Sequence, residues 1–405
     1  MNKKLWTKNF TLIMIGTLIS AVGGVGLNLA LSVTIYDHTE STWLTGIYGA
    51  VTMVPTIILP ILVSPIIDRY SRKNIIVRLD YMMGSLFIVF AFITSKVTFN
   101  YYFYMIIGLI ITLNSVVYQL AYASLFPNLI PKGMMQKGYA IGNLIYPLTN
   151  VLILPVATFV FKHFGVSILF EIEGIFLLAA ASFERMIDIE EVTHKVAFEV
   201  KSHINDIKEG FSYLFKEKGI WNVYLFFVVM MFADSFKLLI YPFFEQHPDL
   251  SLIQYSLLLS LQSAGYMFGG LLHYKIKVPT HLRYLLSLVV YLTFALFDAV
   301  FFFMPFFIMV LMKFMLGIIG MNSANIRVTS INAYIDDDKR GRLNAVFQTM
   351  VGMAMVLGKL FTGWLGASFS YEHIGIFYGL LVSIGVLVFI VRNQKAVKFL
   401  YNREV

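Results

Sequence analysis

The segment SPIIDRYSRKNII (residues 64–76) joins two apolar stretches, 42–67 and 74–95, each of which is long enough to cross a bilayer. In this short loop Asp68 is followed by three basic residues: Arg69, Arg72 and Lys73. Lys and Arg gather in the cytoplasmic loops of membrane proteins, so orientation alone would account for the basic residues. It would not require the acidic residue before them, and the pattern therefore indicates a loop with a further function.

The rest of the chain repeats this alternation of apolar stretch and short loop. Hydrophobic residues make up 58% of the 405 residues and charged residues only 13%, whereas soluble domains carry about 25% charged residues. The sequence therefore predicts an all-α membrane protein. Stretches of about 20 apolar residues predict twelve transmembrane helices, at 9–36, 42–67, 74–95, 100–126, 135–162, 164–187, 219–244, 252–272, 281–298, 301–328, 343–367 and 371–391.

The basic residues predict the orientation of these spans. Most of the 31 Lys and Arg fall in alternate loops and at the two ends of the chain, which places both termini in the cytoplasm. This accounts for the net charge of +8 without a nucleic-acid partner. The first apolar stretch is too long for the core of a signal peptide, so we expect it to be retained. The chain has no Cys, which excludes disulfides and thiolate sites.

One long linker divides the chain into two six-helix halves, 1–187 and 219–405. The linker, 188–218, carries apolar residues at helical spacing opposite charged ones, which predicts an amphipathic helix at the inner membrane face. Its apolar positions are Val200, Ile204, Ile207, Phe211 and Leu214.

A weak internal repeat supports this division. The run that starts at Ile130 and reaches Ala140 leads into the fifth span, and the run from Ile335 to Ala345 leads into the eleventh. The two runs are offset by 205 residues, about half the chain. Such repeats are typical of transporters built from two halves related by pseudo-twofold symmetry.

The loop at 64–76 resembles the signature G-x-L-x-D-R-x-G-R-K/R of the major facilitator superfamily, with Ser64 and Ser71 in place of its glycines. The family's G-P-x-x-G-G stretch in span five reads LPVAT here, at 154–158. Other short segments resemble the drug:proton antiporter branch that includes macrolide efflux pumps. They are 18–23, 78–80, 126–132, 206–214 and 340–342.

The resemblance implies the major facilitator fold and proton-coupled efflux of amphipathic or hydrophobic compounds by alternating access. The alternative is a lysophospholipid or siderophore transporter of the same fold. The resemblance also implies a cytoplasmic gate, for which the candidates are Asp68, Arg69, Arg72, Lys73, Arg340 and Arg342.

Ionisable residues within spans are costly and are therefore candidates for coupling. Asp234 and Lys237 in span seven are three residues apart and share a helix face. They are either a coupling carboxylate held by a cation or a structural pair that neutralises itself. Glu173 in span six is a third candidate, for which we favour a structural role at the outer interface. Glu171 must point away from it, because two residues rotate a helix by about 200°.

In the superfamily, spans one, four, seven and ten line the central cavity, and this supplies the candidates for substrate contacts. Tyr118 and Tyr122 lie one turn apart and offer a stacking face for an aromatic or cationic substrate, or simply a packing face between helices. Glycines 23, 24 and 26 in span one favour bending or close helix contact. The full set of cavity candidates is Asn28, Asn114, Tyr118, Gln119, Tyr122, Tyr241, Lys313 and Asn322.

We find no motif for enzymatic catalysis, a cofactor, a metal or ATP, so we expect no enzyme and transport driven by an ion gradient. The expected partners are a small amphipathic substrate, protons or another coupling ion, and the lipid of the cell membrane. We expect a monomer. A sugar importer would need a more polar cavity, and a sensor would need a soluble output domain.

Overall fold

A computed structural model describes residues 5–191, 200–275 and 278–403. Within these ranges the chain forms helices and no strands. Ten of the described helices are long and apolar enough to cross a membrane. One of them, α5, contains two of the predicted spans, and the 24-residue α9 at Leu252–Lys275 is a further predicted span outside these ten. The all-α membrane fold predicted from the sequence is confirmed.

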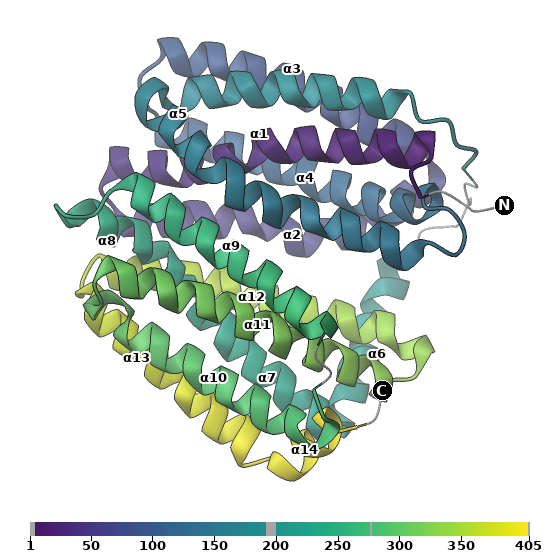
Figure 1. The fold of residues 1–405 in the computed structure, drawn as a ribbon, viewed down its shortest axis with the longest axis vertical. Helices are drawn as coiled ribbons and strands as arrows, with labels where there is room; N and C mark the ends of the chain where they lie inside the picture. The colour runs from purple at the N-terminus through teal and green to yellow at the C-terminus, as the bar shows by residue number, and fades with distance from the viewer. Residues whose placement is uncertain (1–4, 192–199, 276–277, 404–405) are drawn as a thin grey trace. The chain divides into compact units, whose positions relative to one another are not determined.

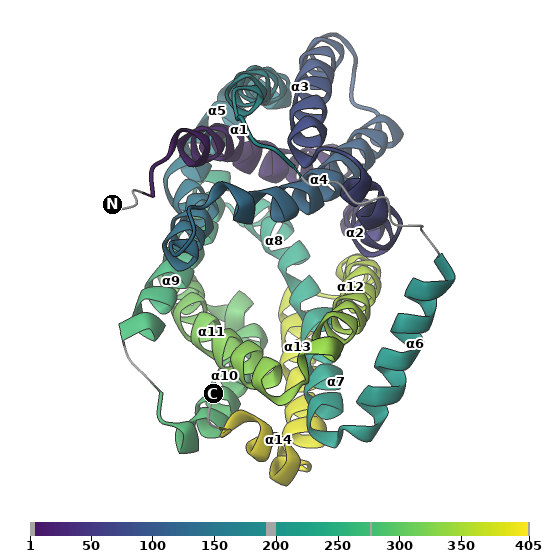
Figure 2. The same cartoon turned by 90° about the vertical axis from the view of Figure 1, so that its right-hand side faces the viewer.

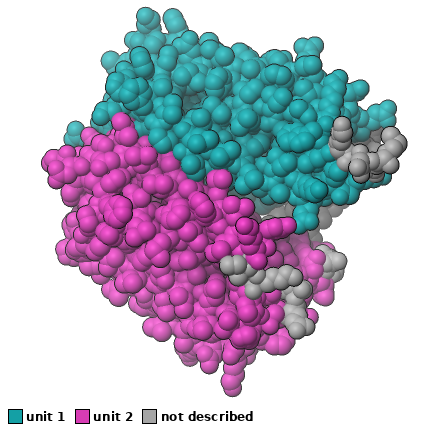
Figure 3. All heavy atoms as spheres, in the orientation of Figure 1, with its two compact units in different colours: residues 1–40, 51–198 teal, residues 41–50, 199–405 magenta. Residues whose placement is uncertain are grey.

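The chain divides into two compact units, residues 1–40 with 51–198 and residues 41–50 with 199–405 (Figure 3). Unit 1 contains α1, α3, α4, α5 and the part of α2 from residue 51 onward, and in it α5 packs along both α1 and α3 (Figure 1). The bounds of these helices are α1 Lys8–Thr39, α2 Thr42–Arg69, α3 Arg72–Lys96, α4 Tyr101–Leu129 and α5 Met135–Arg185.

Short polar side chains set the starts of three of these helices. Thr7, Ser71 and Asn100 each accept a hydrogen bond from the backbone N–H three residues ahead, at the first turns of α1, α3 and α4. This is the favoured way to satisfy the free amides at a helix N-terminus. These caps help to fix where α1, α3 and α4 begin.

A single glycine divides α5. Gly165 has φ 79° and ψ −178°, a backbone conformation that residues with a side chain rarely adopt. The two predicted spans, 135–162 and 164–187, lie on either side of it. In the first part of α5, before this break, Ala157 contacts Gly26 of α1 so closely that a methyl group on the glycine would overlap the alanine. The close helix contact that the family's span-five glycines suggest is thus made here by a glycine on the opposite helix.

The second segment of unit 2 starts with helix α6, Val200–Lys216, which lies within the linker 188–218 (Figure 2). Span seven is not one continuous α-helix: α7 Lys218–Ala233 continues as the 3₁₀ turn η1 Asp234–Leu239 and then α8 Ile240–Gln246. The remaining elements are α9, η2 Thr280–Leu282, α10 Arg283–Val300, η3 Phe301–Phe303, α11 Phe306–Tyr334, α12 Asp337–Gly366, α13 Tyr371–Gly385, the π-helical turn Val386–Val391 and α14 Gln394–Tyr401.

Residues 41–50 belong to unit 2, although the sequence analysis places them in the first half. Glycines explain this difference. A Cβ on Gly46 would lie 2.6 Å from the backbone oxygen of Lys359 and 3.0 Å from Cα of Gly363. Thr42 also donates a hydrogen bond of 2.9 Å to the carbonyl of Gly363. The first turns of α2 therefore pack backbone to backbone on α12.

Candidate functional site

The site begins with two buried carboxylates on the second part of α5, which lie against glycines of α1. Glu173 is 5% exposed and lies so close to Gly23 that a methyl group there would overlap its Oε2. Glu184 is fully buried, and a Cβ on Gly16 would lie 2.9 Å from its Cγ. The α1 glycines thus leave the space that the two carboxylates occupy.

Glu173 lines a cavity of about 320 Å³ within unit 1, which we call the acidic chamber. Helices α1, α3, α4 and α5 contribute its walls. Four of its lining side chains have a buried oxygen without a hydrogen-bond partner, and such groups are rare in folded proteins. These oxygens are Ser20 Oγ, Asp80 Oδ2, Asn114 Oδ1 and Glu173 Oε2.

Asp80 brings a second carboxylate into this chamber from α3, where it is 3% exposed. Its charge interacts with those of Glu173 and Glu184. Like charges in a poorly solvated space repel one another and favour whatever neutralises them, which is a proton or a cation. The chemistry of the acidic chamber is therefore to take up positive charge.

Tyr118 of α4 joins this chamber to a second one. The second cavity, of about 340 Å³, is the aromatic chamber, and both cavities are lined by Tyr118, Gln119 and Tyr146. In it Tyr118 stacks on Tyr122 with ring centres 6.0 Å apart. Tyr122 in turn stacks on Phe126 at 5.3 Å. These offset, nearly parallel rings give the aromatic chamber a flat apolar wall.

Hydrogen bonds hold this aromatic wall in place. The hydroxyl of Thr17 in α1 donates to that of Tyr122 over 3.1 Å. The hydroxyl of Tyr118 donates a hydrogen bond to the carboxylate of Glu184. Both bonds tie α4 to a neighbouring helix of unit 1, so the tyrosines have fixed orientations.

The structure brings six of the predicted residues together around these two chambers: Asn28, Asn114, Tyr118, Gln119, Tyr122 and Glu173. The burial of Glu173 does not fit the interfacial role that we favoured for it, whereas Glu171 is exposed on the opposite face as expected. Asp80 and Glu184 were not among the predicted site residues. The spacing of Glu173 and Glu184 contains a signal, because eleven residues are almost three whole turns and place both on one helix face.

A second group of charged side chains within the spans lies in unit 2. Asp234 and Lys237 form an ion pair at 2.6 Å, with both side chains partly exposed. Lys313 of α11 is 2% exposed, and its Nζ lies 4.7 Å from the ring centre of Phe301. Asp298 of α10, which we did not predict, is close enough for its charge to interact with that of Lys313. Each charge in this group therefore has a neighbour of opposite sign or an aromatic face.

Two predicted cavity residues of unit 2 make contacts within the protein. The amide of Asn322 donates 2.8 Å and 3.3 Å hydrogen bonds to the carbonyls of Ile318 and Gly269, and so fastens α11 to α9. Tyr241 is buried, its ring centre lies 5.5 Å from that of Tyr255, and its hydroxyl donates a hydrogen bond of 3.3 Å to Glu245. Their contacts indicate structural roles.

The signature loop contains a helix cap. Both oxygens of Glu191 accept hydrogen bonds at the start of α3: from the Ser71 hydroxyl at 2.7 Å and from the backbone amides of Arg72 and Lys73 at 2.7 Å and 3.1 Å. A carboxylate is favoured at this end of a helix. The Asp68 side chain lies outside what the structure describes, and Arg69 is exposed.

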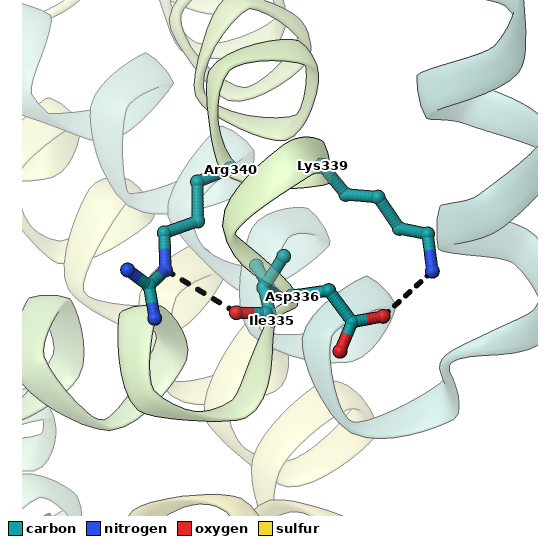
Figure 4. A network of polar contacts seen from close by, with 4 residues as sticks. All are labelled: Ile335, Asp336, Lys339 and Arg340. Carbon is teal, nitrogen blue, oxygen red and sulfur yellow. Dashed lines mark hydrogen bonds and ion pairs between the residues drawn. The ribbon is translucent and has the colours of Figure 1, made fainter.

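The basic residues in the first turns of α12 stabilise local structure in unit 2. Arg340 donates through Nε to the carbonyls of Asn332 and Ile335, at 2.8 Å and 3.2 Å, and so closes the end of α11 (Figure 4). Lys339 pairs with Asp336 at 2.7 Å, which holds the pKa of the Asp336 carboxyl below its usual value. Arg342 pairs with Glu209 of α6 at 2.9 Å.

A helical membrane fold with buried, unpartnered carboxylates opening onto cavities defines a membrane transporter. The chain belongs to the Major Facilitator Superfamily, whose family model matches residues 13–328.

The chain is similar to macrolide efflux protein A of Streptococcus pyogenes, with 19% identity over 273 residues. The aligned part covers 66% of this chain and 66% of that protein, just under two thirds of its length. Among solved structures, the nucleoside transporter NupG matches with a TM-score of 0.71 and 11% identity over 95% of this chain and 99% of that one. A bacterial homologue of the iron transporter ferroportin matches with a TM-score of 0.66 and 14% identity over 96% and 99%. These structures support the fold.

Proposed function

We propose that this transporter exports amphipathic organic compounds in exchange for protons, and that the carboxylates of the acidic chamber couple the two movements. The observation that carries the proposal is the pair of unpartnered oxygens on Asp80 and Glu173, in a chamber that adjoins an aromatic one. A carboxylate without a partner in such a place gains most from a proton. The weak similarity to a macrolide efflux protein supports the direction of transport.

Glu173 is a better coupling group than Asp234, for a physical reason. Asp234 already has Lys237 as a counter-ion at 2.6 Å, so its charge is neutralised without a proton. Glu173 has no such cation among the contacts described, and its nearest charged neighbours in unit 1 include a second carboxylate. A proton that leaves or enters Glu173 therefore changes the net charge of the chamber, which an exchange mechanism requires.

The test uses the purified full-length protein in proteoliposomes with an imposed pH gradient and a panel of amphipathic compounds. We expect accumulation of some of them that collapses when a protonophore is added. Glu173→Gln should abolish gradient-driven accumulation and leave downhill exchange, while Glu171→Gln, on the same helix but exposed, should behave as the unmodified protein. Accumulation that is unaffected by the protonophore and is driven by a sodium gradient would contradict the proposal. Proton-driven accumulation in Glu173→Gln would contradict it as well.

A further inference from the structure

We infer that the substrates are aryl-substituted primary amines, with the ammonium group in the acidic chamber and the ring in the aromatic chamber. The inference rests on the proposed function and names the substrate class of the same site. It starts from the acceptors of the acidic chamber and from the way the two chambers join.

Among the described residues, Asp80, Asn114 and Glu173 each bring to the lining of the acidic chamber an acceptor oxygen without a hydrogen-bond partner, and the Ser20 hydroxyl is a fourth such group. Two of these side chains are charged and more than nine-tenths buried. A primary ammonium group has three N–H donors and no acceptor. Its three donors can therefore satisfy the oxygens of Asp80, Asn114 and Glu173 together, and its charge opposes that of the two carboxylates, while the Ser20 hydroxyl can itself donate. Hydrogen bonds between charged partners are also the strongest that such a site can make.

The adjoining aromatic chamber indicates that the cation is organic. A small inorganic cation would use only the oxygens, whereas the stacked rings of Tyr122 and Phe126 offer a face for a planar apolar group. Tyr118 and Gln119 line both chambers, so one molecule can reach from the carboxylates to the rings. A compound with an amine at one end and an aromatic ring at the other can bind the carboxylates of the acidic chamber and the rings of the aromatic chamber at the same time.

This assignment separates primary amines from other lipophilic cations. A trimethylammonium group has the same charge but no N–H, so it would leave the three acceptors without partners. An unpaired buried polar group is costly to a complex, which is why sites built for a hydrogen-bond donor reject analogues that lack it. The chamber should thus distinguish two cations of equal charge.

The experiment measures binding and proton-driven transport of three compounds by the full-length protein in lipid nanodiscs and proteoliposomes. The compounds are naphthylethylamine, its trimethylammonium derivative and naphthylethanol, which share the ring. We expect the primary amine to bind at least about tenfold more tightly than either analogue, the effect of one or more charge-assisted hydrogen bonds. Asp80→Asn and Glu173→Gln should each remove this preference, whereas Glu171→Gln should keep it. Tyr122→Ala should weaken the binding of all three compounds to the same extent.

The outcomes separate the inference from the function on which it rests. Equal binding and transport of the three compounds by the unmodified protein would overturn the inference and leave proton-driven export standing. Displacement of the amine by sodium ions together with equal transport of naphthylethanol would assign the acidic chamber to an inorganic cation, which also overturns it. If other amphipathic compounds are exported but the amine is not bound, only the inference fails. If no compound of any charge moves with the proton gradient, the proposed function itself fails.

Discussion

The hydroxyl of Tyr118 donates a hydrogen bond of 2.9 Å to Oε1 of Glu184, a carboxylate with no exposed surface. The other oxygen, Oε2, has no hydrogen-bond partner. This single bond therefore stabilises a buried charged group and also fixes the ring that stands between the two chambers. The position of the Tyr118 ring between the two chambers therefore depends in part on Glu184.

Replacing Tyr118 with phenylalanine should affect stability and transport together. The change keeps the ring but leaves both Glu184 oxygens unpartnered, at a cost of about 1–3 kcal/mol for a buried polar group. We expect a lower thermal unfolding midpoint in detergent and slower transport. Tyr102→Phe, an exposed position on the same helix, is the control. The double variant Tyr118→Phe with Glu184→Gln should lose less stability than the sum of the single changes, and simple additivity would contradict the coupling.

Asp234 and Lys237 should behave as a structural pair. Removing either charge leaves the other without its counter-ion in a span, so each single neutralisation should lower membrane abundance. The double change, Asp234→Asn with Lys237→Gln, should restore abundance and proton-driven transport, as measured in proteoliposomes. Restored abundance without coupled transport would contradict this and would support the other interpretation from the sequence, in which Asp234 is a coupling carboxylate held by Lys237.

Ser71 should matter as a helix cap. The family comparison alone suggests that glycine at this position would be neutral or favourable. Because Ser71 caps α3 and also bonds to Glu191, we expect Ser71→Ala to lower stability by about 1 kcal/mol, and Ser71→Gly by only a few tenths. Thermal unfolding of both variants measures this. In the background of Glu191→Gln the loss from Ser71→Ala should be smaller, and an unchanged loss would show that the two residues act independently.

Gly46→Ala should force α2 and α12 apart, because the added methyl group would meet the backbone of α12, which cannot give way as a side chain would. Overpacking of this kind costs about 1–3 kcal/mol. We expect reduced abundance and transport. Gly270→Ala is the matched control: a Cβ there meets no atom within 4 Å, and alanine should stabilise α9 slightly. Equal behaviour of the two variants would argue against a close helix contact.

The spans can be predicted from the sequence because each is a largely apolar stretch of about 20 residues or more. Patterns within one stretch of sequence do not show which residues of different helices contact each other. Nothing next to Glu173 in the sequence shows that Gly23 faces it, so a residue expected at an interface is instead buried in a chamber. The break of span seven into a 3₁₀ turn at Asp234–Leu239 has one mark in the sequence, Pro242, which cannot donate a hydrogen bond to the carbonyl four residues earlier.

The candidate site is only partly predictable for the same reason. Tyr118 and Tyr122 are visible from their spacing on one helix. Asp80 lies two residues after Arg78 at the start of a span, so from the sequence its charge would be assigned to the signature region. Only the packing of α3 on α5 places it near the other carboxylates. A hydrogen-bond partner from another helix, such as Glu184, cannot be deduced from either stretch alone.

The break at Gly165 has a consequence for the biosynthesis of the chain. The two parts of α5, 135–164 and 166–185, are separated by one residue of non-helical conformation, which leaves too little chain for the first part to settle in the bilayer long before the second is made. We therefore expect the two parts to enter the membrane together. A tag or reporter inserted at Gly165 would therefore interfere with membrane insertion itself, whatever its effect on the finished transporter.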